Sequence, residues 1–149
     1  MTKLQNERTI KATREKLWSI LSNLEELDKY DPTVSRSVSL SAGASGLGAS
    51  RKVDMKDGKN WFKEKITIWN PIQALSYQLT DCSFPVSGLS HSYTFEQTTD
   101  GVKVKQIMEY TVKFGWLGRL MDTLMIRQQT QAGIDKFFDG LKKYSEQQS

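Results

Sequence analysis

The chain has 149 residues, of which 38% are hydrophobic and 26% charged, a composition typical of a soluble globular protein. This length suits a single domain with its own core, so we expect one domain over residues 1–149. No apolar run reaches the roughly 20 residues of a membrane-spanning helix, and no secretory signal is evident at the N-terminus. We therefore expect a cytoplasmic protein without stable membrane insertion.

Charge and rare side chains exclude further classes. The net charge is +4, but the 21 basic residues are scattered among 17 acidic ones, so we expect no nucleic-acid partner. Cys82 and His91 are the only residues of their kinds, which rules out an internal disulfide and predicts neither a metal site nor a cofactor. The glycines of "SGLGAS" lack the Gly-Lys-Ser ending of a P-loop. The oligomeric state is not indicated by the sequence.

The first thirty residues predict a strand and two helices. A weak strand pattern covers residues 3–12, and Thr13 is placed to cap a helix through "REKLWSILSNL". A second short helix over residues 25–29 must end before Pro32.

Strand patterns then follow one another. They cover residues 34–40, 49–55, 61–69, 74–80, 89–97 and 102–114, and the small-residue stretch at 41–50 is interpreted as a loop. Asp57-Gly58 and Asp100-Gly101 are each flanked by alternating residues, which indicates two β-hairpins. The sheet should therefore be largely antiparallel.

From Gly115 onward the hydrophobic period becomes helical. The apolar stripe consists of Leu117, Leu120, Met121, Leu124, Ile134, Phe138 and Leu141. It predicts one long helix to about Tyr144, in which Gly133 marks a kink, a close approach or a tolerated weak spot. The order of elements predicts an α+β fold in which a curved antiparallel sheet wraps a C-terminal helix.

An acidic residue on an apolar strand face gives the first indication of a functional site. In "KNWFKEKITIW", Glu64 shares its face with Phe62 and two isoleucines, while the lysines lie on the other face. A two-residue hairpin loop places Arg51 opposite Glu64 and Val53 opposite Phe62. A three-residue loop would instead oppose Val53 with Lys63 and break the apolar face, so we prefer the first register.

The second hairpin extends the same mixed face. Counting through Asp100-Gly101 pairs Val104 with Gln97, Gln106 with Phe95, Met108 with Tyr93, and Tyr110 with His91. The predicted face contains Val102, Val112, Phe114, Gln106, Tyr110, Tyr93 and His91, and the neighbouring strand adds Leu75, Tyr77 and Leu79. Such a mixture is typical of a ligand cavity rather than a dry core. The alternative is that the Arg51 and Glu64 pair only fixes the register of its hairpin.

The candidate ligand-contacting residues come from this face and from the long helix. They are Arg51, Phe62, Glu64, Tyr77, His91, Tyr93, Gln106, Met108, Tyr110, Met121 and Leu124. Glu64 and His91 are also candidate general acid/base residues. For His91, the tyrosines and the Met121 and Leu124 patch, a structural role in the core is the alternative.

At this point the chain resembles the START-like (SRPBCC) superfamily, and within it the small bacterial polyketide cyclase/dehydrase-type proteins. The likeness rests on "REKLWSILSNLEELDKYDPTV", "GLGASRKVDMKDG", "FKEKITIWNP", "LSYQL", "FPVSGLSHSYTFE" and "GRLMDTLMIRQQTQAGIDKFFDGLKKY", which follow the family's order. The resemblance implies a helix-grip fold, in which a seven-stranded sheet grips the long helix around a cavity for lipids or other hydrophobic molecules. Plant hormone receptors of the superfamily have a gating turn similar in position to "KDGKN" and a cavity acid similar to Glu64, but their gate and latch sequences are missing here.

These features leave three functions open. The first is a non-enzymatic binder or carrier of a hydrophobic small molecule or lipid that bears one polar group. The second is a cyclase, dehydratase or hydrolase-like enzyme that uses Glu64 or His91; because an Arg partner lowers a carboxylate pKa, Arg51 would make Glu64 a better base than acid. The third is a protein-interaction module, which would show a filled cavity and a large exposed apolar patch.

Overall fold

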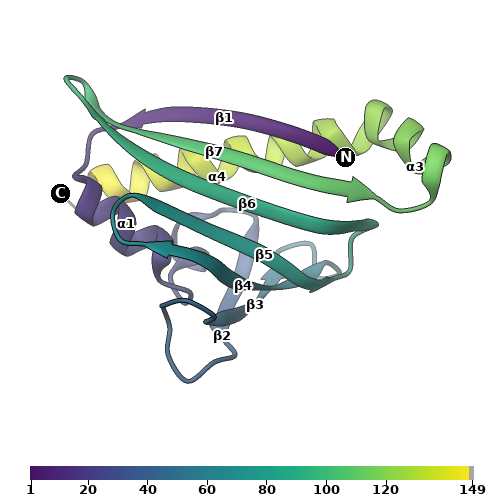
Figure 1. The fold of residues 1–149 in the computed structure, drawn as a ribbon, viewed down its shortest axis with the longest axis horizontal. Helices are drawn as coiled ribbons and strands as arrows, with labels where there is room; N and C mark the ends of the chain where they lie inside the picture. Colours follow the sequence, from purple (N-terminus) through teal and green to yellow (C-terminus); the bar gives the residue numbers. More distant parts are fainter. Residues whose placement is uncertain (148–149) are drawn as a thin grey trace.

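The computed structural model describes residues 1–147, except for the side chains of residues 123 and 124, and shows a curved sheet packed against a C-terminal helix (Figure 1). The strands are β1 (Thr2–Ile10), β2 (Val34–Ser39), β3 (Ser50–Met55), β4 (Trp61–Asn70), β5 (Ala74–Cys82), β6 (Val86–Thr98) and β7 (Gly101–Val112). They form one seven-stranded antiparallel sheet in the order β1-β7-β6-β5-β4-β3-β2. The predicted α+β class and helix-grip architecture are confirmed.

Two short helices follow β1, as the sequence predicts. Helix α1 (Arg14–Ser22) is capped by Thr13, whose hydroxyl oxygen accepts a hydrogen bond from the Lys16 amide at 3.1 Å. Helix α2 (Leu27–Tyr30) begins two residues later than the pattern predicts and ends at Tyr30, with Asp31 as its C-cap immediately before Pro32. The loop predicted at residues 41–50 is also present, with β3 beginning at its last residue.

The two predicted hairpin registers have different outcomes. In the β3/β4 pair Arg51 lies opposite Glu64 and Val53 opposite Phe62, so that register is confirmed. In the β6/β7 pair Gln106 lies opposite Tyr93, which shows that the register counted through Asp100-Gly101 is wrong by two residues.

The backbone of Gly101 explains the error in the second hairpin. Gly101 is paired with Thr98 as the first residue of β7, so the two-residue turn is Thr99-Asp100. Its φ of 141° and its close approach to the Ile10 backbone of β1 leave no room for a Cβ atom. The glycine therefore serves strand packing rather than the turn, and because the shift is an even number of residues, every side chain keeps its predicted face.

The predicted C-terminal helix is present from Gly115 to Gln147, but it is not a uniform α-helix. The segment consists of α3 (Gly115–Met121), a π-helical turn η1 (Asp122–Ile126) and α4 (Arg127–Gln147). The interruption lies at η1 and not at Gly133, where an added Cβ would have no neighbour within 4 Å. Gly133 therefore marks neither a kink nor a close backbone approach.

Only the second half of the predicted helical stripe is buried. Ile134, Phe138 and Leu141 of α4 pack into the main core, where they are at most 4% exposed. In contrast, Leu117 and Leu120 of α3 are 48% and 50% exposed. Because α3 extends beyond the end of the sheet, it has little to pack against (Figure 1).

Phe114 also departs from the prediction, since it is 68% exposed instead of facing the cavity. It follows the end of β7 and has a φ of 77°, which turns the chain away from the strand direction before α3 begins. Among residues 1–147, no helix is long and apolar enough to cross a membrane.

Candidate functional site

A cavity of about 450 Å³ lies between the sheet and the helical segment formed by η1 and α4. Ten of the eleven predicted ligand-contacting residues line it: Arg51, Phe62, Glu64, Tyr77, His91, Tyr93, Gln106, Met108, Tyr110 and Met121. The side chain of the eleventh, Leu124, is outside the part that the structure describes. The cavity therefore brings together side chains from strands β3 to β7 and from the C-terminal helical segment.

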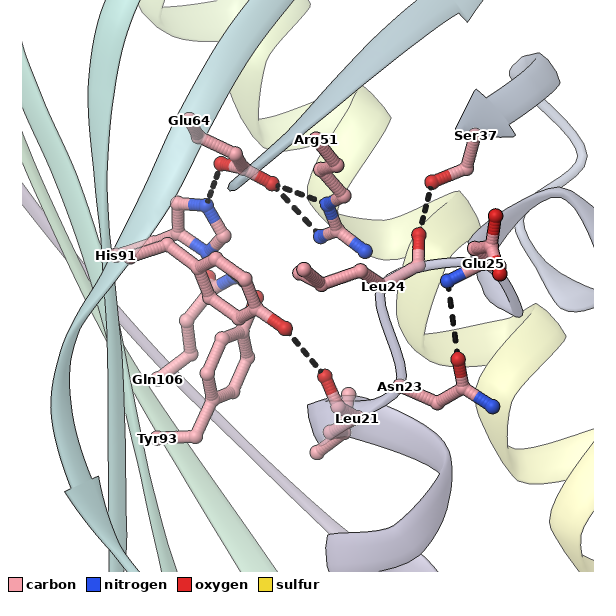
Figure 2. A network of polar contacts seen from close by, with 11 residues as sticks. Leu21, Asn23, Leu24, Glu25, Ser37, Arg51, Glu64, His91, Tyr93 and Gln106 are labelled. Atoms are coloured by element: carbon pink, nitrogen blue, oxygen red, sulfur yellow. Dashed lines mark hydrogen bonds and ion pairs between the residues drawn. The ribbon is translucent and has the colours of Figure 1, made fainter. Parts of the chain in front are cut away.

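Arg51 and Glu64 form a buried ion pair in this cavity (Figure 2). Nε and Nη2 of Arg51 both contact Oε2 of Glu64, at 2.8 and 2.7 Å. Arg51 is 4% exposed and Glu64 is fully buried. Their strands place them directly opposite each other, as the confirmed hairpin register requires.

His91 contacts the other oxygen of the same carboxylate. Its Nε2 lies 2.7 Å from Oε1 of Glu64, and its Nδ1 lies 2.9 Å from the hydroxyl of Tyr93. The imidazole ring stacks on Tyr77 with a centroid separation of 5.0 Å, and the Arg51 guanidinium lies 4.6 Å from the centroid of that tyrosine ring. The Tyr77 hydroxyl in turn donates to the Leu21 carbonyl at 2.7 Å and ties the sheet to α1.

The hydrogen-bond directions in this network follow from the carboxylate of Glu64. A carboxylate only accepts, so Nε2 of His91 carries the proton and donates to it. The Tyr93 oxygen accepts from Nε2 of Gln106 at 3.1 Å. When the imidazole is neutral, its Nδ1 accepts from the Tyr93 hydroxyl, and the donors run in one direction from Gln106 through Tyr93 and His91 to Glu64.

Electrostatics keep Glu64 ionised. Burial by itself raises the pKa of Glu64, but the positive charge of Arg51 and the hydrogen bonds from Arg51 and His91 outweigh it and lower the pKa to about 2. Burial opposes the charged form of Arg51 as well, yet the nearby Glu64 carboxylate raises the pKa of Arg51 above its usual value. Burial raises the pKa of Tyr77 to about 12, so this phenol stays neutral.

Two polar atoms of the network are left without partners. Nη1 of Arg51 and Oε1 of Gln106 are buried and have no hydrogen-bond partner within residues 1–147. In Figure 2 the Arg51 nitrogen that carries no dashed line points away from Glu64. Gln106 is 2% exposed, and both side chains line the cavity. Such atoms are uncommon in folded proteins and require an explanation.

A second polar cluster connects the cavity wall to the π-helical turn. Asp122, at the start of η1, accepts hydrogen bonds from the hydroxyls of Tyr110 at 2.6 Å and Thr2 at 2.5 Å. Sequence reasoning missed Asp122, although an acid inside the apolar run "LMDTLMI" was a usable signal. Its carboxylate turns inward to the ends of β1 and β7, and π-helical turns of this kind are frequent at functional sites.

Sequence reasoning also missed several other lining residues. They include Tyr30, Asp31, Met55, Phe84, Leu89 and Phe137. Most of them come from α2, α4 and the segments between strands, where no alternating pattern identifies the inward side. Burial raises the pKa of Asp31, although hydrogen bonds from Thr33 oppose this effect.

The whole-chain comparison identifies the family to which this arrangement belongs. Residues 1–146 match the family described as polyketide cyclase / dehydrase and lipid transport. The chain belongs to this family. The predicted resemblance to the START-like superfamily is thereby confirmed, whereas no curated protein sequence matches the chain significantly.

Solved structures share the fold of this polyketide cyclase and lipid transport family member at low sequence identity. The protein XoxI from Bacillus cereus is 15% identical, with a TM-score of 0.76 over 97% of this chain and 96% of its own. A major latex-like protein from Panax ginseng is 10% identical, with a TM-score of 0.78 over 97% of both chains. The di-domain ARO/CYC StfQ from the steffimycin biosynthetic pathway is 14% identical, with a TM-score of 0.80 over 98% of this chain and 51% of its own.

Proposed function

We propose that the protein binds and carries a hydrophobic small molecule or lipid in its cavity, without transforming it. The observation that carries the proposal is the cavity of about 450 Å³, whose walls are mainly Leu, Met, Phe and Tyr side chains with a few convergent polar groups. This size and lining are typical of small-molecule sites. The family's description, which includes lipid transport, supports the same function.

The state of the candidate acid/base residues favours carriage over catalysis. Both oxygens of Glu64 are engaged, one by Arg51 and one by His91, and the pKa of Glu64 is lowered to about 2. Both ring nitrogens of His91 are engaged as well. A general base needs a free acceptor within reach of the substrate, and here each acceptor is already used within the protein.

A second candidate function is an acid/base enzyme of the cyclase or dehydratase type. It is favoured by the contact of 2.7 Å between Glu64 and His91 inside the cavity, because a carboxylate that orients an imidazole is a recurring catalytic arrangement. In this alternative a substrate displaces the Tyr93 hydroxyl, and Nδ1 of His91 accepts the substrate proton. Product formation that is abolished in His91→Gln, with ligand binding retained, would support it.

The experiment that tests carriage combines ligand identification with a blocked cavity. Native mass spectrometry and solvent extraction of the purified protein should reveal a bound hydrophobic molecule, and a lipid and aromatic library should contain compounds that raise the melting temperature. Gly133→Phe should abolish both, since Gly133 lines the cavity and an added side chain meets open space there. Gly133→Ala is the matched control and should still bind. A protein that stays empty and shows no shift with any compound would contradict the proposal.

A further inference from the structure

The unpartnered atoms of the cavity network limit the chemistry of the ligand. Nη1 of Arg51 is a donor, and Oε1 of Gln106 is an acceptor. The Gln106 amide nitrogen donates to the Tyr93 hydroxyl, which leaves the Gln106 oxygen as the free acceptor. The cavity therefore offers a ligand one buried donor and one buried acceptor.

The charges around the cavity argue against an anionic ligand. Arg51 is the only Lys or Arg among the described residues that line the cavity, and Glu64 already neutralises it. His91 is already held by Glu64 as well, and the remaining ionisable groups are the acid Asp31 and the phenols of Tyr30, Tyr77, Tyr93 and Tyr110. A carboxylate in the cavity would thus be a buried charge without a counter-charge, which is strongly unfavourable.

We propose that the polar end of the ligand is neutral and carries both an acceptor and a donor, as a primary amide, an alcohol or a hydroxy-carbonyl group does. Its acceptor takes the hydrogen bond from Nη1 of Arg51, and its donor binds Oε1 of Gln106. The inference rests on the proposed function, because it names the class of molecule that the same cavity carries. A preference for a neutral polar end distinguishes this site from a site for fatty acid anions, whose apolar tails can be the same as those of neutral lipids.

Three probes with one tail test the proposal. Lauramide supplies an acceptor and a donor, methyl laurate supplies acceptors alone, and laurate at neutral pH supplies acceptors and a negative charge. Dissociation constants from calorimetry or competition with a fluorescent probe should show lauramide binding at least about tenfold more tightly than laurate, with methyl laurate between them. Laurate binding as tightly as lauramide would overturn the inference.

A variant of Gln106 isolates the acceptor. Gln106→Met keeps the length of the side chain and removes the acceptor, so the preference for lauramide over methyl laurate should fall to nearly none. Ile107→Leu is the matched control, since Ile107 lies on the same strand but is 39% exposed on its other face, and it should retain the preference. Equal affinity of the wild-type protein for all three probes would overturn this inference and leave the proposed function intact, whereas binding of none of them would overturn both.

A separate observation concerns the outer surface next to the cavity. We define the α3 surface as Phe114, Trp116, Leu117, Leu120, Met121 and Met125, which are between 38% and 73% exposed. Helix α3 extends past the end of the sheet (Figure 1). Met121 and Met125 belong to this surface and also line the cavity, so the apolar surface continues into the cavity wall. A cluster of this kind on a chain in water marks an interaction site.

The charges beside the α3 surface indicate what covers it. Residues 113–127 include the basic side chains Lys113, Arg119 and Arg127 and a single acid, Asp122, which is 4% exposed and pairs with Arg127 at 3.4 Å, so the segment keeps a net positive charge. Pairing of two copies through this surface would bring two basic sets together. A bilayer with anionic lipids has the complementary charge, and exposed Trp, Phe and Leu beside basic residues are typical of interfacial binding.

We infer that the α3 surface docks on an anionic lipid bilayer and places the methionine-lined wall of the cavity at the membrane. Sedimentation with vesicles of phosphatidylcholine and phosphatidylglycerol should recover the protein, vesicles of phosphatidylcholine alone should recover less, and added salt should weaken binding. The double variant Trp116→Ser with Leu120→Ser should lose most binding at an unchanged melting temperature. Leu47→Ser, at a 70% exposed leucine of the loop before β3, is the control. Equal recovery of the double variant, or dimers that form through this surface without vesicles, would overturn the inference.

Discussion

Arg51 and Glu64 face each other across β3 and β4, and two guanidinium nitrogens of Arg51 converge on one oxygen of Glu64, at 2.7 and 2.8 Å. This geometry leaves the second Glu64 oxygen to His91 and the third Arg51 nitrogen to the cavity. We therefore expect the pair to stabilise the hairpin, and it also supplies one of the polar atoms that we assign to ligand recognition. Mutations can separate these two roles, because one depends on charge balance and the other on a single N–H group.

Glu64→Gln should strongly destabilise the protein. The substitution leaves the Arg51 guanidinium buried without its counter-charge, and breaking a buried pair from one side costs about 3–5 kcal/mol. Urea denaturation followed by circular dichroism should show this loss at pH 7. A change below about 1 kcal/mol would mean that water or another group replaces the carboxylate, contrary to the full burial of Glu64.

Replacing both partners should restore much of the stability. In Arg51→Met combined with Glu64→Leu no charge remains buried, and apolar replacements of buried ion pairs are often neutral or stabilising. The double variant should unfold within about 1–2 kcal/mol of the wild-type protein yet lose the preference for lauramide over methyl laurate, because Nη1 is gone. A double variant that retained this preference would exclude Arg51 as a ligand-contacting residue.

The stability difference between the wild-type protein and Glu64→Gln should depend on pH. The pKa of Glu64 is lowered to about 2 in the folded protein from an ordinary value of 4.5, so the folded state favours the ionised form. Its stabilising contribution is then fully present above about pH 4.5 and is lost as the pH falls toward 2. Denaturant titrations of both proteins between pH 7 and 2.5 should show the difference shrinking only below about pH 4.5. A constant difference across this range would mean that the pKa of Glu64 is not lowered.

The paired strands were predictable from the sequence because alternation and hairpin geometry determine both partners. Asp57-Gly58 placed Arg51 opposite Glu64 without knowledge of the fold, and the mixed polar and apolar face identified the strands that line the cavity. The error at Asp100-Gly101 arose because a glycine can serve a turn or a close strand contact equally well. The decisive contact, with Ile10 of β1, lies 91 positions away along the chain and leaves no local signal.

The helical part was less predictable because a helical period shows that one face is apolar, but not what covers it. Leu120 and Leu141 fit the same apolar stripe, yet Leu120 lies beyond the end of the sheet and is half exposed, whereas Leu141 is buried in the core. At the π-helical turn Asp122 binds the hydroxyls of Thr2 and Tyr110, and the hydrophobic period of the sequence does not predict such long-range contacts. The hydrogen-bond partners within the cavity network likewise could not be predicted, because they depend on interatomic distances that no sequence pattern gives.

Asp122→Ala should loosen η1 and α3 while the core remains folded. The substitution removes the acceptor of the Tyr110 and Thr2 hydroxyls, and local segments with few buried contacts open most easily. Hydrogen exchange measured by mass spectrometry should show faster exchange in residues 115–126 and unchanged protection in β6 and β7. Asp139→Ala, at an exposed acid of α4, is the control and should leave the segment unchanged. Unchanged exchange in Asp122→Ala would mean that the apolar contacts of Ile126 hold the turn.

The two glycines of α4 should respond in opposite directions to the same substitution. An added Cβ at Gly140 would collide with the backbone carbonyl of Tyr30 in α2, whereas at Gly133 it would have no neighbour within 4 Å. Gly140→Ala should therefore destabilise the protein by at least about 1–3 kcal/mol, because a backbone atom has to move. Gly133→Ala should stabilise it by about 0.5–1 kcal/mol, the difference between the two residues inside a helix. Urea denaturation of both variants measures these two changes in the free energy of unfolding. The Gly133→Ala protein can also be tested for ligand binding, since the added methyl group reduces the cavity volume only slightly. Equal effects of the two substitutions would mean that α4 does not pack on α2 through Gly140.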